Sequence, residues 1–490
     1  MNDQAHDPRR TPIPLYVDLD NTLIGTDILW EQLIRLVFHK PFLMPWMIFE
    51  GFKGKARLKE YLSDHIELPI EHLPWSKSVI EHLQSHKNKG GLVILATATH
   101  QKMASKISDY LGIFDAVLST NANANLKGTL KARAIADLNI SLNEKHYAYL
   151  GDSLDDIPIW KNAAEAWIVS VDPSTVAQCM KAITRLKMLE PSKKNHFSSW
   201  IKLMRVQQWA KNILLFFPLI LAHKLSNLEL LITTFAAAVS FCFGASGVYL
   251  LNDCSDVFKD RAHPLKKHRP LASGAVRLWQ GLSASLALTV LAFAVAILCV
   301  GKVFALLLLL YFFINFLYTY WIKSVAILDV VILSLFYSFR IFAGGVASSV
   351  EVSKWLLALS LFFFLSLAFG KRYQEIFLLE SVGRKERSRG YLPSDQPVIS
   401  ICGLSAGFVS VMVLVLYISS PEVLKLYRMP DLLWLLAPMG IYWIARFWML
   451  TTRGLLHDDP VLFALKDRVS WMIGAFALIL ITIAQFDWVG

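Results

Sequence analysis

Long uncharged runs dominate the sequence from about residue 212 to the C-terminus. Residues 230–251 and 303–322 are two of them, and neither contains Asp, Glu, Lys or Arg. A helix of about 20 apolar residues is long enough to cross the hydrocarbon core of a bilayer. The whole chain of 490 residues is 55% hydrophobic and only 18% charged, which departs from the usual composition of soluble proteins. The second part of the sequence therefore predicts an all-α, polytopic membrane domain.

The apolar runs predict about nine transmembrane helices. They lie at about residues 206–222, 230–251, 279–300, 303–322, 325–346, 354–370, 397–419, 431–450 and 469–488, and Lys211 and Pro218 interrupt the first. With the N-terminus inside, Lys and Arg are in excess in the inner loops, as the positive-inside rule requires. We expect a multi-pass protein of the cell (inner) membrane, with its N-terminal domain and active sites on the cytoplasmic side.

The net charge of +11 is explained by these basic inner loops, so we expect membrane lipids and no nucleic acid as partners. The N-terminus lacks an apolar signal-peptide core, which fits a cytoplasmic first domain. Five cysteines form no CxxC pair, which argues against a zinc site. The sequence indicates no particular oligomeric state.

Residues 1–190 have the composition of a soluble domain, and a polar stretch, 191–205, predicts a linker to the membrane domain, 206–490. Three short apolar strands are expected, at residues 13–17, 91–97 and 146–151. In an open α/β sheet, ligands bind at the carboxyl ends of the strands. The polar residues that follow or end these strands are Asp18, Asp20, Thr97, Asp152 and Asp156, and Lys131 is expected near a helix start.

Such a set suits phosphoryl transfer. A carboxylate can attack phosphorus and form an aspartyl-phosphate. A second acid two residues later can protonate the leaving oxygen and then activate water. A hydroxyl and an ammonium can hold phosphate oxygens, while further carboxylates bind Mg²⁺.

These motifs resemble the haloacid dehalogenase (HAD) superfamily of phosphatases over about residues 13–175. The resemblance implies an α/β Rossmannoid domain with a helical cap at about residues 23–90. It implies Asp18 as nucleophile, Asp20 as acid/base, and Thr97 and Lys131 as further catalytic residues, with Lys127 as a second candidate for the lysine. The implied Mg²⁺ site contains Asp18, Asp20, Asp152 and Asp156. A non-catalytic phosphate-binding regulator is the alternative.

The aromatic stretch 38–55 within the cap, FHKPFLMPWMIFEGFKGK, has two interpretations. It is either a core helix of the cap or a surface that rests on the membrane or on the second domain.

A charged stretch, NDCSDVFKDRAHPLKKHRP, directly follows the uncharged run that ends at residue 251. Asp253, Asp256 and Asp260 are spaced i, i+3 and i+7, so on a helix they share one face, and Asn252 lies one turn before Asp256. Like charges this close repel, and divalent cations that hold a diphosphate would relieve the repulsion. His263, Lys266 and Arg269 follow and suit further phosphate oxygens.

Two more polar clusters lie within or at the ends of apolar runs. The first contains Tyr318, Lys323, Asp329 and Arg340, and the second contains Lys371, Arg372 and Glu375. A charge inside a membrane segment is costly and usually lines a functional cavity. An internal Asp–Arg pair that packs helices is the alternative for the first cluster, and positive-inside anchoring is the alternative for the second.

Residues 200–490 resemble the UbiA superfamily of intramembrane prenyltransferases, whose first motif, NDxxDxxxD, matches residues 252–260. The extended motif, together with QWAKNILLF, YTYWIKSVAILDV and GKRYQE, is similar to the decaprenyl-phosphate phosphoribosyltransferase branch. The resemblance implies Mg²⁺-dependent transfer of phosphoribose from phosphoribosyl diphosphate to a polyprenyl phosphate. The implied metal ligands are Asn252, Asp253, Asp256 and Asp260. The implied substrate-binding residues are Lys266, Arg269, Tyr318, Lys323, Asp329, Arg340, Lys371 and Arg372.

Aromatic prenyltransferases of this superfamily carry a second motif, DxxxD, whereas the corresponding region here offers only Asp329. That difference favours the phosphoribosyl donor over a polyprenyl diphosphate. Aromatic prenyl transfer remains one alternative, and a transporter with a regulatory phosphate-binding domain is another. The fusion itself predicts that the HAD domain removes the 5-phosphate of the transfer product.

Overall fold

The computed structural model describes residues 12–122, 124–169, 172–189, 196–264, 266–381, 390–421, 423, 427–456 and 460–485. Part of the predicted linker, residues 191–195, lies outside them. The chain divides into two compact units. The first is Met1–Arg205 with Tyr249–Leu286, and the second is Val206–Val248 with Ala287–Gly490. The charged stretch that begins at Asn252 thus belongs to the same unit as the N-terminal domain.

The first unit is built on a six-stranded sheet in the order β3-β2-β1-β4-β5-β6. Every neighbouring pair of strands is parallel. Tyr16, Ile94 and Tyr149 are buried in it, as expected for strands covered on both faces. The strands are β1 (Leu15–Val17), β2 (Val93–His100), β3 (Ala116–Thr120), β4 (Ala148–Gly151), β5 (Glu165–Ile168) and β6 (Leu186–Met188).

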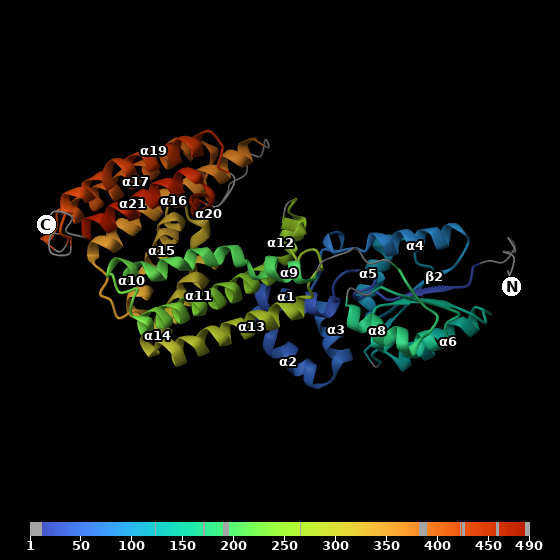
Figure 1. Cartoon of the computed structure of the whole chain (residues 1–490). Helices are drawn as coiled ribbons and strands as arrows, with labels where there is room; N and C mark the ends of the chain where they lie inside the picture. Colours follow the sequence, from blue (N-terminus) through green and yellow to red (C-terminus); the bar gives the residue numbers. More distant parts are fainter. Residues whose placement is uncertain are drawn as a thin grey trace, which may run out of the picture. The chain divides into compact units, whose positions relative to one another are not determined.

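Helices cover both faces of this sheet, with α4 and α5 on one side and α6 and α8 on the other (Figure 1). The helices around the sheet are α4 (Lys77–Asn88), α5 (Gln101–Leu111), α6 (Thr129–Ser141), α7 (Ile157–Asn162) and α8 (Pro173–Ala182), and α9 (His196–Met204) follows β6. The predicted α/β fold with a parallel sheet is confirmed.

Three helices are inserted between β1 and α4, within the predicted cap: α1 (Ile28–His39), α2 (Met44–Phe52) and α3 (Lys55–His65). Asp27 caps α1, because its carboxylate accepts a hydrogen bond from Leu29 N at 2.8 Å. An antiparallel bridge between Ile24 and Trp75 joins the two ends of the insertion.

The last part of the first unit contains the ends of two long helices and the segment between them. These helices are α11 (Leu228–Ser255) and α13 (Leu278–Val295), and the segment includes α12 (Val257–Ala262).

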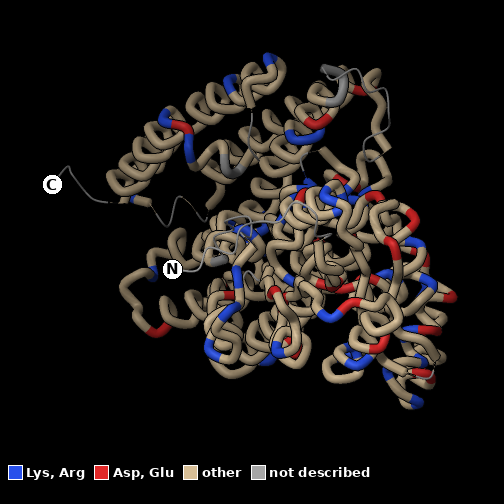
Figure 2. Tube along the Cα trace, turned by 90° about the vertical axis from the view of Figure 1, so that its right-hand side faces the viewer, with Lys and Arg blue, Asp and Glu red and all other residues tan. Residues whose placement is uncertain are grey.

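The second unit is helical. Among the described residues, eight helices are long and apolar enough to cross a membrane. Figure 2 shows long helical stretches that carry few acidic or basic residues. Besides α11 and α13, they are α14 (Lys302–Tyr320), α15 (Leu328–Ala347), α16 (Lys354–Ser381), α17 (Gln396–Ile418), α19 (Leu436–Thr452) and α21 (Arg468–Gln485). The short helix α20 (Pro460–Lys466) precedes α21.

The first predicted span differs from the other eight. Residues 206–222 form a 3₁₀ helix, Val206–Phe216, followed by the short helix α10 (Phe217–Leu221), and not one continuous α-helix. Pro218 stands near the start of α10, where the missing N–H of a proline is tolerated, so it marks the start of a new helix. The fold class is still the predicted one, a helical membrane domain with close to nine spans.

Close helix packing in this unit depends on small residues. A Cβ atom at Gly403 of α17 would lie 2.1 Å from the Trp448 ring of α19, and one at Gly407 would lie 2.5 Å from Ile444. Helices α16, α17 and α19 pack side by side around this contact (Figure 1). Small residues commonly bring transmembrane helices together in this way.

Candidate active sites

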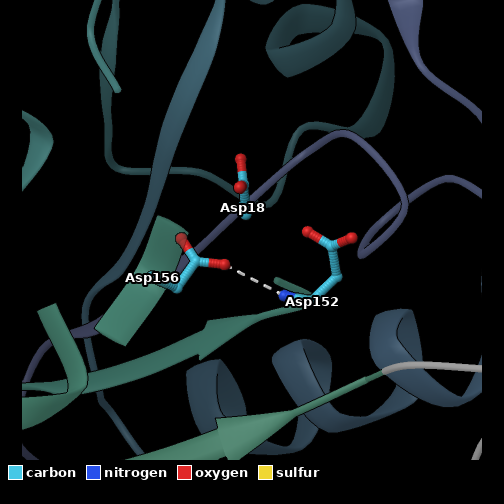
Figure 3. Close-up of side chains that lie close together, drawn as sticks. All are labelled: Asp18, Asp152 and Asp156. Carbon is cyan, nitrogen blue, oxygen red and sulfur yellow. Dashed lines mark hydrogen bonds between the residues drawn. The ribbon is translucent and has the colours of Figure 1, made fainter. Parts of the chain in front are cut away.

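Acidic side chains from three neighbouring segments converge at the carboxyl end of the sheet. Asp18 follows β1, Asp152 follows β4, and Asp156 lies one turn later (Figure 3). Each offers a carboxylate oxygen, and these oxygens all lie within 4.8 Å of one another. Asp156 is oriented by Asp152 N, which donates to its Oδ2 at 3.1 Å, and by Tyr149 OH, which donates to its Oδ1 at 2.7 Å.

Lys131 is the cation at the centre of this cluster. It stands in the first turn of α6, as predicted, and is only 3% exposed. Its Nζ donates to Asp18 Oδ2 at 2.8 Å and lies 3.8 Å from Asp156 Oδ1. Burial alone would lower the pKa of Lys131, but Asp18 and Asp156 raise it above its ordinary value, so the ammonium stays charged.

Burial and mutual repulsion favour the neutral form of the acids, because both raise the pKa of a carboxyl group. Burial raises the pKa of Asp18, and Lys131 offsets part of that rise. Burial, together with Asp156 and Asp18, raises the pKa of Asp152 well above its ordinary value. One buried ammonium therefore does not neutralise three buried carboxylates, and a divalent cation with a preference for oxygen ligands fits this place. Asp18, Asp152 and Asp156 are the residues that would hold it.

Asp20 lies to one side of the cluster. Its Oδ1 accepts a hydrogen bond from Ile28 N at 2.9 Å, and its Oδ2 accepts one from Thr99 Oγ1 at 3.0 Å. Burial, and then the neighbouring Asp27 and Asp18, raise the pKa of Asp20 to about 8. A carboxyl group that keeps its proton near neutral pH is suited to general acid catalysis. This geometry supports an acid/base role for Asp20 more directly than a role as metal ligand.

Thr97 occupies a different place from the one expected. Strand β2 continues to His100, so Thr97 lies inside the strand and is fully buried, and its Oγ1 accepts a hydrogen bond from Thr99 N at 3.0 Å. Thr99, two residues later, lines the cavity and contacts Asp20. Thr99 is not expected at the site if the strand ends at Thr97, as the sequence suggested. The second threonine of the ATATH pattern, residues 96–100, was the available signal for it.

A cavity of about 370 Å³ opens over the acids. It is larger than a phosphate group alone requires. Its basic lining residues are Lys55, Lys59, Lys127 and Arg277. Lys127, the second candidate for the catalytic lysine, pairs with Asp155 at 2.8 Å and is more than half exposed, which favours Lys131 for that role.

The aspartate-rich segment of the first unit is held by arginines. Arg269 Nη1 lies 3.1 Å from Asp253 Oδ1 and 2.7 Å from Asp260 Oδ2, and Arg205 Nη2 also contacts Asp253, at 2.5 Å. Asp253 and Asp260 are nearly fully buried. The two acids predicted to share a helix face therefore meet at one guanidinium.

The expected single helix is interrupted at Asp256, where α11 ends and α12 begins. Backbone hydrogen bonds continue through the break, from Asp256 N to Asn252 O and from Asp260 N to Asp256 O. Asp256 is partly exposed, with Lys259 at 4.0 Å, and Lys266 lies in a short 3₁₀ turn beyond the motif.

In the second unit, three of the predicted residues meet around one buried arginine. Arg372 of α16 donates to Asp329 of α15 at 2.5 Å and to Tyr318 OH of α14 at 3.2 Å. Its Nη1 donates to Glu375 at 2.6 Å, and Tyr391 OH donates to Asp329 at 2.6 Å. Tyr391, which follows residues outside the described part, was not singled out from the sequence.

Arg340 belongs to a different group. It donates to Asn212 Oδ1 at 2.9 Å, to Tyr311 OH at 2.6 Å and to Phe336 O at 2.6 Å. The internal Asp–Arg pair considered for Asp329 and Arg340 is therefore made with Arg372 instead. Lys323 and Lys371 are both half-buried in this unit.

Comparison with known proteins assigns both parts of the chain. The model of the UbiA prenyltransferase family matches residues 213–473, more than half of the chain. The chain belongs to the UbiA prenyltransferase family. A model described as haloacid dehalogenase-like hydrolase matches residues 49–164. The predicted fusion of a HAD-like hydrolase domain to a UbiA-type transferase domain is confirmed, and the chain is a multi-pass membrane protein.

One relative of this UbiA-family chain supports the fusion, because it matches nearly the whole sequence. The uncharacterized protein y4nM of Sinorhizobium fredii is 34% identical over 467 residues, which cover 94% of this chain and 89% of that one. This similarity includes both halves. Nodulation protein NoeC of Azorhizobium caulinodans is 32% identical over 278 residues, covering 56% of this chain and 89% of its own.

The predicted similarity to decaprenyl-phosphate phosphoribosyltransferases is also found. The protein of that name from Corynebacterium glutamicum is 37% identical over 218 residues. The match covers 44% of this chain and 65% of the relative.

Proposed function

We propose that the membrane domain transfers phosphoribose from phosphoribosyl diphosphate to a polyprenyl phosphate, and that the HAD domain then removes the 5-phosphate of the product. Relatives named decaprenyl-phosphate phosphoribosyltransferase support the first step. The buried acidic cluster around Lys131 supports the second.

The observation that carries the transferase assignment is the arrangement around Arg269. Two buried acids of the NDxxDxxxD motif, Asp253 and Asp260, share this arginine. The segment thus combines carboxylates, which bind Mg²⁺, with a guanidinium, which binds phosphate oxygens. A donor that carries both a diphosphate and a 5-phosphate needs both kinds of group.

In the transfer step, an oxygen of the lipid phosphate attacks the anomeric carbon of ribose while the bond from that carbon to the diphosphate breaks. Mg²⁺, when bound, supplies charge neutralisation to the departing diphosphate. Asn252, Asp253, Asp256 and Asp260 would hold the metal and the diphosphate. The phosphate-binding cations would be Lys266, Arg269, Lys323, Arg340, Lys371 and Arg372, with Tyr318 and Asp329 shaping the pocket. The isoprenoid tail would lie among the apolar helices.

In the hydrolysis step, Asp18 attacks the phosphorus of the 5-phosphate, and the ester bond to the ribose 5-oxygen breaks. Asp20 gives its proton to that oxygen and later takes one from the water that hydrolyses the aspartyl-phosphate. Lys131 holds Asp18 in position. Both active sites would lie on the cytoplasmic side, where the second step could use the product of the first at high local concentration.

A donor-swap assay tests the transferase assignment. The purified protein receives Mg²⁺ and a polyprenyl phosphate with phosphoribosyl diphosphate, or an aromatic acceptor with a polyprenyl diphosphate, and released diphosphate is measured. We expect release only in the first mixture, and only when lipid phosphate is present. Release only in the second mixture would assign aromatic prenyl transfer instead, and no release in either would favour a transporter.

A further inference from the structure

One wall of the phosphatase cavity comes from the transferase half of the sequence. Arg277 lines the cavity, and its Nη2 lies 3.7 Å from Asp152 Oδ2. The residue directly precedes α13, far along the chain from every HAD motif. Its side chain is 39% exposed, so a ligand in the cavity can reach it.

The segment that carries Arg277 is fixed against the hydrolase domain by a close backbone contact. A Cβ atom at Gly274 would lie 2.3 Å from Gly25 O, and Gly274 has a φ of +68°. Only glycine allows this approach and this backbone conformation at low cost. Gly25 in turn lies between Asp20 and the cap helix α1, close to the catalytic residues.

A buried ion pair fixes the same segment a second time. Arg261 donates two hydrogen bonds to Glu31 of α1, at 2.6 and 3.0 Å, and its Nε donates to Ala272 O at 3.0 Å. Both side chains are nearly or fully buried. The contacts of Arg261 and Gly274 therefore fix the backbone shortly before Arg277 against the hydrolase domain, which gives the Arg277 side chain a defined position at the cavity.

Within the part of the chain that the structure describes, the Arg277 guanidinium makes no hydrogen bond, so its donors are available to a ligand. Lys59 donates to Ala98 O at 2.6 Å and Asn125 Oδ1 at 2.8 Å, and Lys127 pairs with Asp155 at 2.8 Å. In contrast, the 3.7 Å between Arg277 and Asp152 is longer than a hydrogen bond. A planar guanidinium that lines the cavity can donate hydrogen bonds to two oxygens of one phosphate.

We propose that Arg277 is a specificity-determining residue of the phosphatase cavity, and that it binds the second phosphate of a substrate that carries two. The phosphomonoester faces Asp18, and Arg277 binds the phosphodiester that joins ribose to the lipid. This inference rests on the proposed function. It explains how a hydrolase domain distinguishes the membrane-bound product from small phosphomonoesters: the discriminating cation comes from the transferase half of the same chain.

The test uses the full-length protein in nanodiscs and two substrates. One is p-nitrophenyl phosphate, which has a single phosphate, and the other is the phosphorylated lipid product that the Asp18→Asn variant accumulates. For Arg277→Gln we expect KM for the lipid substrate to rise about tenfold or more, since a charged hydrogen-bonding partner is lost. The kcat/KM for p-nitrophenyl phosphate should stay within about twofold, and Arg277→Lys should restore part of the lipid KM. Arg133→Gln, on the exposed side of α6, is the control and should leave the kinetic constants for both substrates unchanged.

An equal loss on both substrates would mean that Arg277 acts through Asp152 and would overturn the inference, as would an unchanged lipid KM. A wild-type protein that hydrolyses p-nitrophenyl phosphate but not the lipid substrate would instead overturn the proposed function itself.

A separate observation concerns helix α2 of the cap. None of its nine residues is buried, although it consists almost entirely of apolar side chains. Trp46 is 63% exposed, Phe49 54% and Phe52 87%, and Phe42 just before the helix is 70% exposed. An exposed aromatic patch of this kind marks an interaction surface. The core-helix interpretation of this stretch does not fit these exposures.

We infer that this surface, Phe42 to Phe52, inserts into the headgroup region of an anionic lipid bilayer. The ends of two membrane-length helices, α11 and α13, belong to the same compact unit as α2, so the bilayer is a permanent neighbour of this unit. Lys40, Lys53 and Lys55 flank the aromatic residues, whereas Glu50 is the only acid between them. Aromatic side chains with flanking lysines are typical of helices that lie in the membrane interface.

Site-directed spin labelling tests this surface. Phe49→Cys is labelled in full-length protein in phosphatidylglycerol-containing nanodiscs, in a transferase-active background without the native cysteines. Ile140→Cys on α6, at a residue that is 74% exposed, is the control. We expect the label at 49 to be more accessible to oxygen and less accessible to a water-soluble nickel reagent than the label at 140. Equal access of the nickel reagent would overturn the inference, and so would protection of position 49 from both reagents, which would indicate a protein partner.

Discussion

Glu31 of the cap helix accepts a hydrogen bond of 2.6 Å from Arg261, which directly follows Asp260 of the aspartate-rich motif. The two residues are 230 positions apart in the chain, and both are buried. The hydrolase cap and the aspartate-rich motif are thus parts of one compact unit. This physical link supports the view that the two activities work on one substrate in sequence.

The Glu31–Arg261 pair should be important for the stability of the first unit. Glu31→Gln leaves the arginine buried without its counter-charge, which costs about 3–5 kcal/mol and should lower the apparent Tm by about 5–15 °C. Differential scanning calorimetry in nanodiscs measures this. The double variant Glu31→Leu with Arg261→Leu should lose less than Glu31→Gln alone, and a larger loss would show that the two charges are not coupled.

Lys131 should be essential for phosphatase activity. Lys131→Met removes the ammonium that contacts Asp18, so turnover of p-nitrophenyl phosphate should fall by about 10²-fold or more. Lys127→Met removes a lysine that is more than half exposed and paired with Asp155, and it should cost less than about threefold. The reverse order of the two losses would assign the catalytic lysine to position 127.

Asp152 should set the metal requirement of the phosphatase. With Asp152→Asn, the Mg²⁺ concentration for half-maximal activity should rise about tenfold or more, since one carboxylate of the cluster is lost. Asp155→Asn is the matched control, because Asp155 is exposed and lies outside the three-carboxylate cluster. A magnesium titration of both variants that gave the same curve would contradict the metal assignment.

Asp256 should matter for transfer only. Asp256→Ala should lower the formation of lipid product by at least about 100-fold, while hydrolysis of p-nitrophenyl phosphate stays unchanged. Lys259→Ala, at the exposed neighbour of Asp256, is the control and should keep both activities. Unimpaired lipid product from Asp256→Ala would remove this residue from the metal site.

Residues whose positions follow from local rules could be predicted from the sequence. Asp18 and Asp152 follow short apolar strands, and parallel strands bring their carboxyl ends to the same edge of the sheet. Lys131 stands at a helix start, which brings it to the same edge. The end of strand β2 was predicted three residues too early, because the exact end of a strand depends on pairing with neighbouring strands, here β3, as well as on the strand's own residues.

Long-range partners could not be predicted in this way. Asp329 pairs with Arg372 and not with Arg340, although Arg340 lies on the same helix, α15. Which arginine pairs with an acid depends on how the helices pack against one another, and this packing cannot be predicted from the local patterns of a single sequence. The place of Arg277 at the phosphatase cavity could not be predicted either, because nothing near it in sequence connects it with that cavity.

The most direct test of the coupled two-step scheme is mass spectrometry of the lipid formed from phosphoribosyl diphosphate and a polyprenyl phosphate. Wild-type protein should yield polyprenyl-phosphoryl-ribose, and the Asp18→Asn variant should accumulate the same lipid with one additional phosphate. Identical lipid products from the two proteins would contradict the scheme.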